Sequence, residues 1–170
     1  MKKNSLLLSE AKNFSGNVLG IGDIDDKLVD ILNKNDSVNE LNIISKKNYN
    51  MGSCSGKTKK ITLKNLRKFK KKKVNYLIVD YDNINNYLKT FIKDSIYITK
   101  EYIYFVTNDK KIVTYYRRYK TQIKEIKCSD KSIYIIDTRL AKNNKIKEFI
   151  YSIVDTISKL IDLITNLLLS

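Results

Sequence analysis

Short apolar runs rich in Ile, Val and Tyr alternate with segments of helical spacing along most of the chain. Runs that are apolar at nearly every position predict strands buried on both faces, and such strands are typical of a largely parallel sheet covered by helices. The predicted strands are residues 17–22, 40–45, 59–64, 74–81, 100–107, 121–129 and 131–139, and the predicted helices are residues 23–34, 65–73, 83–95 and 109–119. The pattern therefore predicts a three-layer α/β domain.

The last two predicted strands are close neighbours in the sequence. Residues 121–129 and 131–139 are joined by a turn at Ser129, Asp130 and Lys131. This spacing allows a hairpin, so one of the two strands must run antiparallel to its neighbour. We expect a Rossmann-like, mostly parallel sheet with an antiparallel closing hairpin.

Two local signals support the helix assignments. The aspartates within residues 23–26 precede the apolar face that begins at Leu28, and they suit a helix start through capping and the helix dipole. Leu66 and Phe69 lie three residues apart in a basic segment, so both are expected to face the core from a short helix.

The carboxy-terminal segment has a different pattern. From Lys145 onward, apolar residues recur at alternating spacings of three and four, which predicts a long amphipathic helix over residues 143–169. Asp155, Lys159 and Asp162 interrupt this segment, which makes it unlike a transmembrane span. We divide the chain into a domain at residues 1–142 and this helix at residues 143–170. Three roles stay open for its apolar stripe: packing on the sheet, a dimer seam, or docking on a membrane surface.

The chain is strongly basic. Its 170 residues include 33 Lys and Arg against 18 Asp and Glu, a net charge of +15, and its 42% apolar content suits one globular core. Ten basic residues with no acidic one form a basic run, namely Lys57, Lys59, Lys60, Lys64, Arg67, Lys68, Lys70, Lys71, Lys72 and Lys73. This run is either a solvated face or a surface that binds nucleic acid, anionic headgroups or an acidic partner.

Histidine is absent from the chain. Its absence excludes Ser-His and Cys-His nucleophile pairs and zinc sites of the HExxH type. Cys54 and Cys128 lie far apart without CxxC spacing, so neither a disulfide framework nor a zinc site is predicted. The amino-terminal apolar run is too short for a signal peptide, and we expect a reducing, cytoplasmic setting.

The segment "MGSCSGKTKK", residues 51–60, resembles a phosphate-binding P-loop. That motif has four residues between its two glycines and lies directly between a strand and a helix. Here three residues separate Gly52 from Gly56, and a predicted strand follows Thr58. We therefore predict a basic surface loop instead of a nucleotide site.

The segment "NVLGIGDIDD", residues 17–26, has the context that a ligand site requires. An apolar strand ends in glycines and a helix follows, near the start of an alternating α/β chain. Glycine lets a ligand approach the backbone closely, and open α/β sheets bind ligands beside such strand ends. The alternative is that these glycines merely allow a tight turn.

The order of elements over residues 10–139 resembles the class I S-adenosylmethionine-dependent methyltransferase fold. In that family the first strand and its turn usually read V-L-D-I-G-x-G-x-G, and the matching positions here are Val18, Leu19, Ile21 and Gly22. Gly20 stands where the family has an acidic residue, while Ile24 and Asp26 replace the second and third glycines.

The resemblance implies S-adenosylmethionine as the cofactor and gives positions for its site. Those positions are Gly20, Ile21, Gly22 and Asp23 at the cofactor turn, Ser45 on the ribose side where the family usually has an acid, and Asp80 and Tyr81 beside the methyl-transfer site. A side chain as large as Ile24 is expected to obstruct the turn. The chain therefore either binds the cofactor in a modified way, with weakened activity, or keeps the fold without the chemistry.

The resemblance also raises a question of cover for the sheet. The family usually has one or two helices before its first strand, whereas only a short segment precedes residue 17, so one flank is expected to lack cover. We hypothesise that the helix at residues 143–169 supplies this cover or pairs with a second copy. Rival functions are a non-catalytic module that holds RNA or an acidic partner with the basic run, and a homodimeric scaffold.

Overall fold

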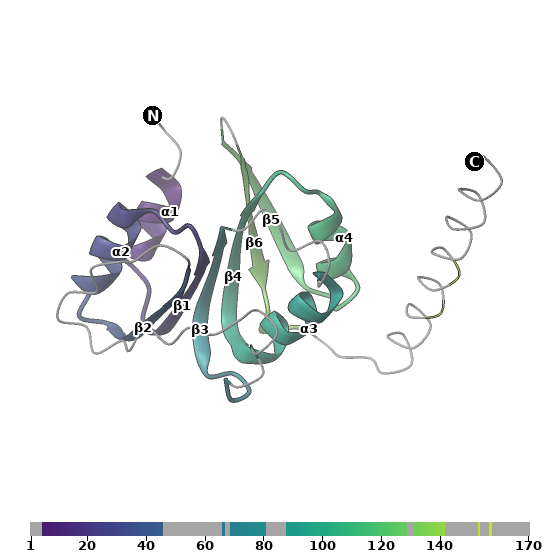
Figure 1. The fold of residues 1–170 in the computed structure, drawn as a ribbon, viewed down its shortest axis with the longest axis horizontal. Helices are drawn as coiled ribbons and strands as arrows, with labels where there is room; N and C mark the ends of the chain where they lie inside the picture. Colours follow the sequence, from purple (N-terminus) through teal and green to yellow (C-terminus); the bar gives the residue numbers. More distant parts are fainter. Residues whose placement is uncertain are drawn as a thin grey trace.

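The computed structural model describes residues 5–45, 66, 69–80, 88–128, 131–141, 153 and 157. Figure 1 shows the arrangement of the elements. The strands are β1 (Gly16–Gly22), β2 (Val38–Ile44), β3 (Val74–Asp80), β4 (Thr99–Thr107), β5 (Gln122–Lys127) and β6 (Ser132–Asp137). The helices are α1 (Ser5–Ala11), α2 (Asp26–Asn33), α3 (Leu88–Ile98) and α4 (Lys111–Arg117).

The described strands form one sheet in the order β2-β1-β3-β4-β6-β5. The pairs β1–β2, β1–β3 and β3–β4 are parallel, whereas β6 runs antiparallel to both β4 and β5. This confirms the predicted Rossmann-like sheet with its closing hairpin. The hairpin can be short because antiparallel neighbours need no crossover helix.

Helices cover both faces of this sheet, so the described fold has three layers (Figure 1). Alternate residues of each strand point to opposite faces. Leu19, Leu77 and Phe105 therefore join one core with residues of α3 and α4. Val18 and Ile78 join a second core with residues of α1 and α2. Burial on both faces explains why the central strands read as continuous apolar runs.

Helix α1 was not predicted, and it corrects the expectation that one flank of the sheet lacks cover. Its Leu7 and Ala11 are buried in the same core as residues of α2. Phe14 follows α1 and stacks on Tyr76 of β3, with ring centroids 4.1 Å apart and planes 3° apart. The hydroxyl of Tyr104 donates to Glu10 Oε2 at 3.1 Å, which attaches the end of α1 to β4.

Capping sets the start of α2 three residues later than the predicted boundary at residue 23. Asp25 is the N-cap residue, and its side chain accepts a hydrogen bond from Lys27 N at 2.9 Å. The prediction that aspartate caps this helix is confirmed. Asp23 and Ile24 instead belong to the turn between β1 and α2.

The predicted basic helix at residues 65–73 is wrong over residues 69–73, which are not helical, whereas Leu66 has a 3-10 conformation. Lys72 has a φ of 55°, which no right-handed helix accommodates. Four consecutive lysines also repel one another, and that repulsion disfavours a helix. The expectation for the apolar pair is confirmed: Leu66 is fully buried and Phe69 packs against the same core.

Several predicted segments lie outside the described residues. They are the loop at residues 51–60, the strand at residues 59–64, the first part of the helix at residues 83–95 and almost all of the helix at residues 143–169. Ile153 and Ile157 are described; both are helical, with 44% and 52% of their surfaces exposed. The division at residue 142 and the role of the last helix stay predictions. Within the part of the chain that is described, no helix is long and apolar enough to cross a membrane.

Candidate functional site

The strand order places a topological switch point between β1 and β3. From β1 the chain passes through α2 to β2 on one side, and β3 then pairs with the other side of β1. Connections that depart in opposite directions leave a crevice at the carboxyl ends of the two central strands, which is where open α/β sheets bind ligands. The candidate site is therefore the edge where β1, β2 and β3 end.

The register between β1 and β3 brings two of the predicted site residues face to face. Gly22 is the Cα partner of Asp80, and the main-chain N–H of Asp23 donates to Asp80 O at 3.2 Å. Gly22 has a φ of +96°, a conformation that residues with a Cβ rarely adopt. The turn after β1 is thus fixed directly against the end of β3.

Ser45 joins this group from the end of β2. Its hydroxyl lies 3.5 Å from Oδ1 of the exposed Asp23, which is a long contact. Gly22, Asp23, Ser45 and Asp80 therefore meet at one edge, although they come from three strands. Tyr81, the remaining residue predicted for this edge, lies outside the described residues.

Gly20 and Ile21 lie inside β1 instead of at its end. A Cβ at Gly20 would lie 3.1 Å from Ile24 Cγ1, so the missing side chain makes room for Ile24. Ile24 is 3% exposed and belongs to the core beside α2. Ile24 was expected to obstruct the turn. Its large side chain instead fills the space above Gly20. Ile21 is buried in the opposite core.

Asp80 has a cationic partner that the sequence analysis missed. Lys131 Nζ lies 2.8 Å from Asp80 Oδ1, and the exposed fractions of the two side chains are 30% and 25%. Lys131 directly precedes β6, and its main-chain oxygen accepts a hydrogen bond from Cys128 N, which closes the hairpin turn. An antiparallel strand in the closing hairpin was predicted without saying which strand it is; β6 runs antiparallel to β4, which puts the start of β6 at the carboxyl end of β4. The direction of β6 is the sequence-based signal that could have placed Lys131 near Asp80.

The hydrogen-bond donors of the turn are largely engaged within the chain. Asp23 N donates to Asp80 O, Ile24 N donates to Gly22 O at 3.1 Å, and Lys27 N donates to the Asp25 carboxylate. Phosphate sites need such main-chain N–H groups pointing at the ligand. The carboxylates of Asp23 and Asp80 would also repel an anion. The edge therefore suits a ligand with positive charge better than one with phosphates.

The charges of these residues are compatible with S-adenosylmethionine, the cofactor that the resemblance implies. The carboxylates and the Ser45 hydroxyl can accept or share hydrogen bonds with amino and hydroxyl groups. Gly22 has a positive φ, which a residue with a Cβ would adopt only under strain. At the position that the resemblance assigns to the ribose, Ser45 supplies a hydroxyl where the family usually has a carboxylate, and a charge-assisted hydrogen bond is lost.

The described part of the basic run lies at the other edge of the sheet. Lys70, Lys71, Lys72 and Lys73 directly precede β3, so they lie at its amino end, whereas Asp80 ends it. Lys72 points inward: Lys72 Nζ donates to the carbonyl oxygens of Thr99 at 2.6 Å and Ile96 at 3.1 Å, and lies 3.4 Å from that of Thr138. Burial and the charge of Lys71 lower the pKa of Lys72. Lys72 is therefore a structural cation and not part of a binding surface.

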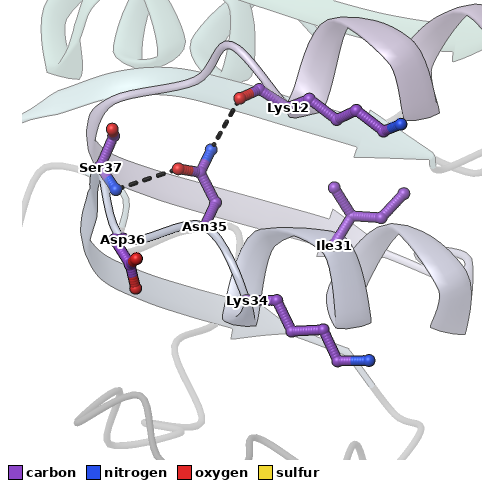
Figure 2. A pocket seen from close by; sticks show the side chains of 6 residues that line it. All are labelled: Lys12, Ile31, Lys34, Asn35, Asp36 and Ser37. Atoms are coloured by element: carbon purple, nitrogen blue, oxygen red, sulfur yellow. Dashed lines mark hydrogen bonds between the residues drawn. The ribbon is translucent and has the colours of Figure 1, made fainter.

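A separate open hollow of about 470 Å³ lies beside the amino end of β2. Figure 2 shows the side chains of Lys12 and Lys34 on either side of Ile31, with Asn35 between the ends of α1 and α2. Asn35 Nδ2 donates to the carbonyl oxygens of Ala11, Lys12 and Phe14, and Asn35 Oδ1 accepts from Ser37 N. Because this central amide is engaged within the chain, we assign the hollow a structural role.

Comparisons with known proteins give a likeness of fold. No protein-family model matches the chain, and no curated protein matches it. Among solved structures, M. capricolum TrmK in complex with S-adenosyl-homocysteine has a TM-score of 0.56 at 10% identity, covering 94% of this chain and 88% of that chain. The tRNA (m1A58) methyltransferase TrmI from Aquifex aeolicus has a TM-score of 0.51 at 12% identity, covering 80% and 68%.

A further neighbour is the spermidine synthase from Thermotoga maritima. It has a TM-score of 0.56 at 14% identity, and the match covers 81% of this chain and 58% of that one. At these identities the likeness concerns the fold alone. The chain has a fold similar to that of S-adenosylmethionine-dependent methyltransferases.

Proposed function

We propose that this protein binds S-adenosylmethionine at the carboxyl ends of β1, β2 and β3, as a methyltransferase-like protein whose catalytic activity is weakened or lost. Gly22 and Asp23 form the cofactor turn, Ser45 lies on the ribose side, and Asp80 borders the place of methyl transfer. Gly20 and Ile21 contribute by shaping β1, and Tyr81 is assigned beside Asp80.

The observation that carries this proposal is the pairing of Gly22 with Asp80 at the topological switch point. It puts a glycine turn and a carboxylate together at the edge where open α/β sheets bind ligands. A bound S-adenosylmethionine supplies an activated methyl group on a positively charged sulfur. The carboxylates of Asp23 and Asp80 favour such a cation electrostatically.

The site also accounts for weakened activity. No described residue at the end of β2 supplies a carboxylate for the ribose hydroxyls, since Ser45 stands there. A neutral hydrogen bond in place of a charged one costs about ten-fold or more in affinity. Asp80 is also paired with Lys131, which reduces its strength as an acceptor for other groups.

Titration calorimetry of the full chain with three ligands tests the proposal. We expect heats of binding with S-adenosylmethionine and with S-adenosylhomocysteine, and none with ATP, because the main-chain donors of the turn are largely engaged within the chain. Asp23→Asn should weaken S-adenosylmethionine binding, whereas Asp36→Asn, an aspartate at the opposite edge of the sheet, should leave it unchanged. No heat with S-adenosylmethionine at millimolar concentration would remove the proposal and leave the fold intact.

A second candidate function rests on the basic run and the net charge of +15. One structural neighbour is named as a tRNA methyltransferase, so RNA is the partner class that we propose for this run. The affinity for a short RNA should fall steeply as salt rises, because phosphate contacts release counterions. Replacing Lys70 and Lys71 by glutamine should weaken RNA binding. Lys72→Gln should lower the stability of the protein but leave the RNA affinity of the folded protein unchanged. An affinity that is flat with salt would contradict this function.

A further inference from the structure

Lys131 reaches the candidate site from the residue before β6, a strand that does not border the switch point. Asp80 is paired with Val106 of β4, and Val106 is paired with Ile133 of β6. Lys131 precedes Ile133 by two residues, and residues two apart in an extended chain lie on the same face of a sheet. The Lys131 side chain therefore passes over the end of β4 to reach Asp80.

The same alternation puts Asp80 and Gly22 on one face. Val18, Ile78 and Val106 belong to the core under α1 and α2, and residues two or four positions along each strand share that face. The ammonium of Lys131 thus lies where the turn after β1 and the end of β3 meet. A positively charged ligand group that binds Asp80 Oδ1 therefore competes with this ammonium.

The ion pair is exchangeable, because both side chains are partly exposed and such pairs contribute little to stability. Lys131 can therefore leave Asp80 without unfolding the hairpin, whose register is held by main-chain pairing with β4 and β5. A ligand whose group nearest to Asp80 is uncharged gains nothing from displacing it.

We propose that Lys131 is the resident counter-cation of Asp80 and that the sulfonium of a bound S-adenosylmethionine replaces it. Lys131 thereby sets the preference between S-adenosylmethionine and the product S-adenosylhomocysteine, whose sulfur is an uncharged thioether. The proposal rests on the proposed function for the identity of the ligand. Lys131 is then a specificity residue: while it remains at Asp80, it penalises the sulfonium form and is neutral toward the thioether.

Calorimetry with Lys131→Met tests this assignment, because methionine keeps an unbranched side chain and removes the charge. The affinity for S-adenosylmethionine should rise about five-fold, in line with an exposed ion pair, while the affinity for S-adenosylhomocysteine stays within about two-fold. Lys124→Met, a lysine on the other strand of the same hairpin, controls for the loss of one positive charge. In an Asp80→Asn background, Lys131→Met should give no gain.

Two results would overturn the proposal: an unchanged ratio of the two affinities in Lys131→Met, or an equal rise in Lys124→Met. If neither cofactor form binds any variant, the proposed function fails. The role of Lys131 at Asp80 is then tested separately with a small sulfonium ion. Trimethylsulfonium should shift the amide NMR signals of Gly22 and Asp23 in Lys131→Met and not in the unmodified chain. Equal shifts in both proteins, or none in either, would show that Lys131 does not compete with a cationic ligand for Asp80.

Discussion

We predict that the hydrogen bonds of the Lys72 ammonium stabilise the amino end of the sheet. Its ammonium donates to carbonyl oxygens in the last turn of α3 and at the start of β4, and lies near a third after β6. The last carbonyls of a helix have no partners within the helix, and a cation there is doubly favourable. Lys72 therefore joins three segments that are distant in sequence.

The expected loss for Lys72→Met follows from these contacts. A hydrogen bond to a charged group contributes about 1.5–3 kcal/mol, and one ammonium shares this gain among its acceptors. Burial, which lowers the pKa of Lys72, offsets part of it. We expect the free energy of unfolding to fall by about 2 kcal/mol, which corresponds to a drop of about 4–8 °C in Tm for a chain of this size.

Urea denaturation followed by circular dichroism measures this change. Lys120 is the matched control, because it is an exposed lysine with nearly the same backbone angle, φ 56° against 55°. Lys120→Gly relieves the left-handed strain and should stabilise the protein by about 0.5–1 kcal/mol. Lys72→Gly relieves the same strain yet should destabilise, since it also removes the ammonium. If Lys72→Met unfolds within about 0.5 kcal/mol of the parent, the ammonium does not hold these segments together.

Three further predictions concern the core, the turn and the end of the chain. Burial raises the pKa of Tyr116, so the contribution of its hydroxyl to the free energy of unfolding is complete below pH 10 and is lost as pH rises further, by up to about 1.4 kcal/mol per pH unit. In Tyr116→Phe the free energy of unfolding should therefore decline less between pH 10 and pH 11. Urea titrations at both pH values measure this difference. Gly20→Val should cost about 1–3 kcal/mol by overpacking against Ile24, and Ile24→Ala should recover part of that loss in a double-mutant cycle; additive losses would refute the contact. Truncation at Asn143 should yield insoluble or unfolded protein if the last helix covers the sheet or forms a dimer, and a soluble chain with an unchanged Tm would refute that hypothesis.

The apolar pattern was sufficient to predict the sheet and its closing hairpin. β3 is apolar at nearly every position because it is buried on both faces, and the short turn before β6 required antiparallel pairing. Helix α1 escaped prediction because a seven-residue helix shows too few turns for its spacing to be distinctive. Its stability comes from contacts such as Phe14 on Tyr76, which pair residues distant in sequence.

The candidate site was only partly predictable for the same reason. Gly22 and Asp23 are adjacent in sequence, so a strand-turn-helix pattern locates them. The contact of Asp80 with Lys131 joins residues 51 apart, and it depends on the register of two strand pairs that no local pattern specifies. Lys72 was misassigned to a surface for a similar reason, since its charge alone gave no sign of the carbonyl groups that surround it.

The strand order that creates the switch point also implies a sequence of events during folding. The β5–β6 hairpin makes contacts between residues only seven apart, such as Ser132 and Glu125, whereas the contact of Asn17 with Asn75 across β1 and β3 spans 58 residues. Closing the longer loop costs more entropy, so β1 and β3 are expected to pair late. Pulse-labelling hydrogen exchange should protect β5 and β6 before Gly22. The candidate site would then exist only in the completed fold, and a nascent or partly unfolded chain would hold its hairpin before that site has formed.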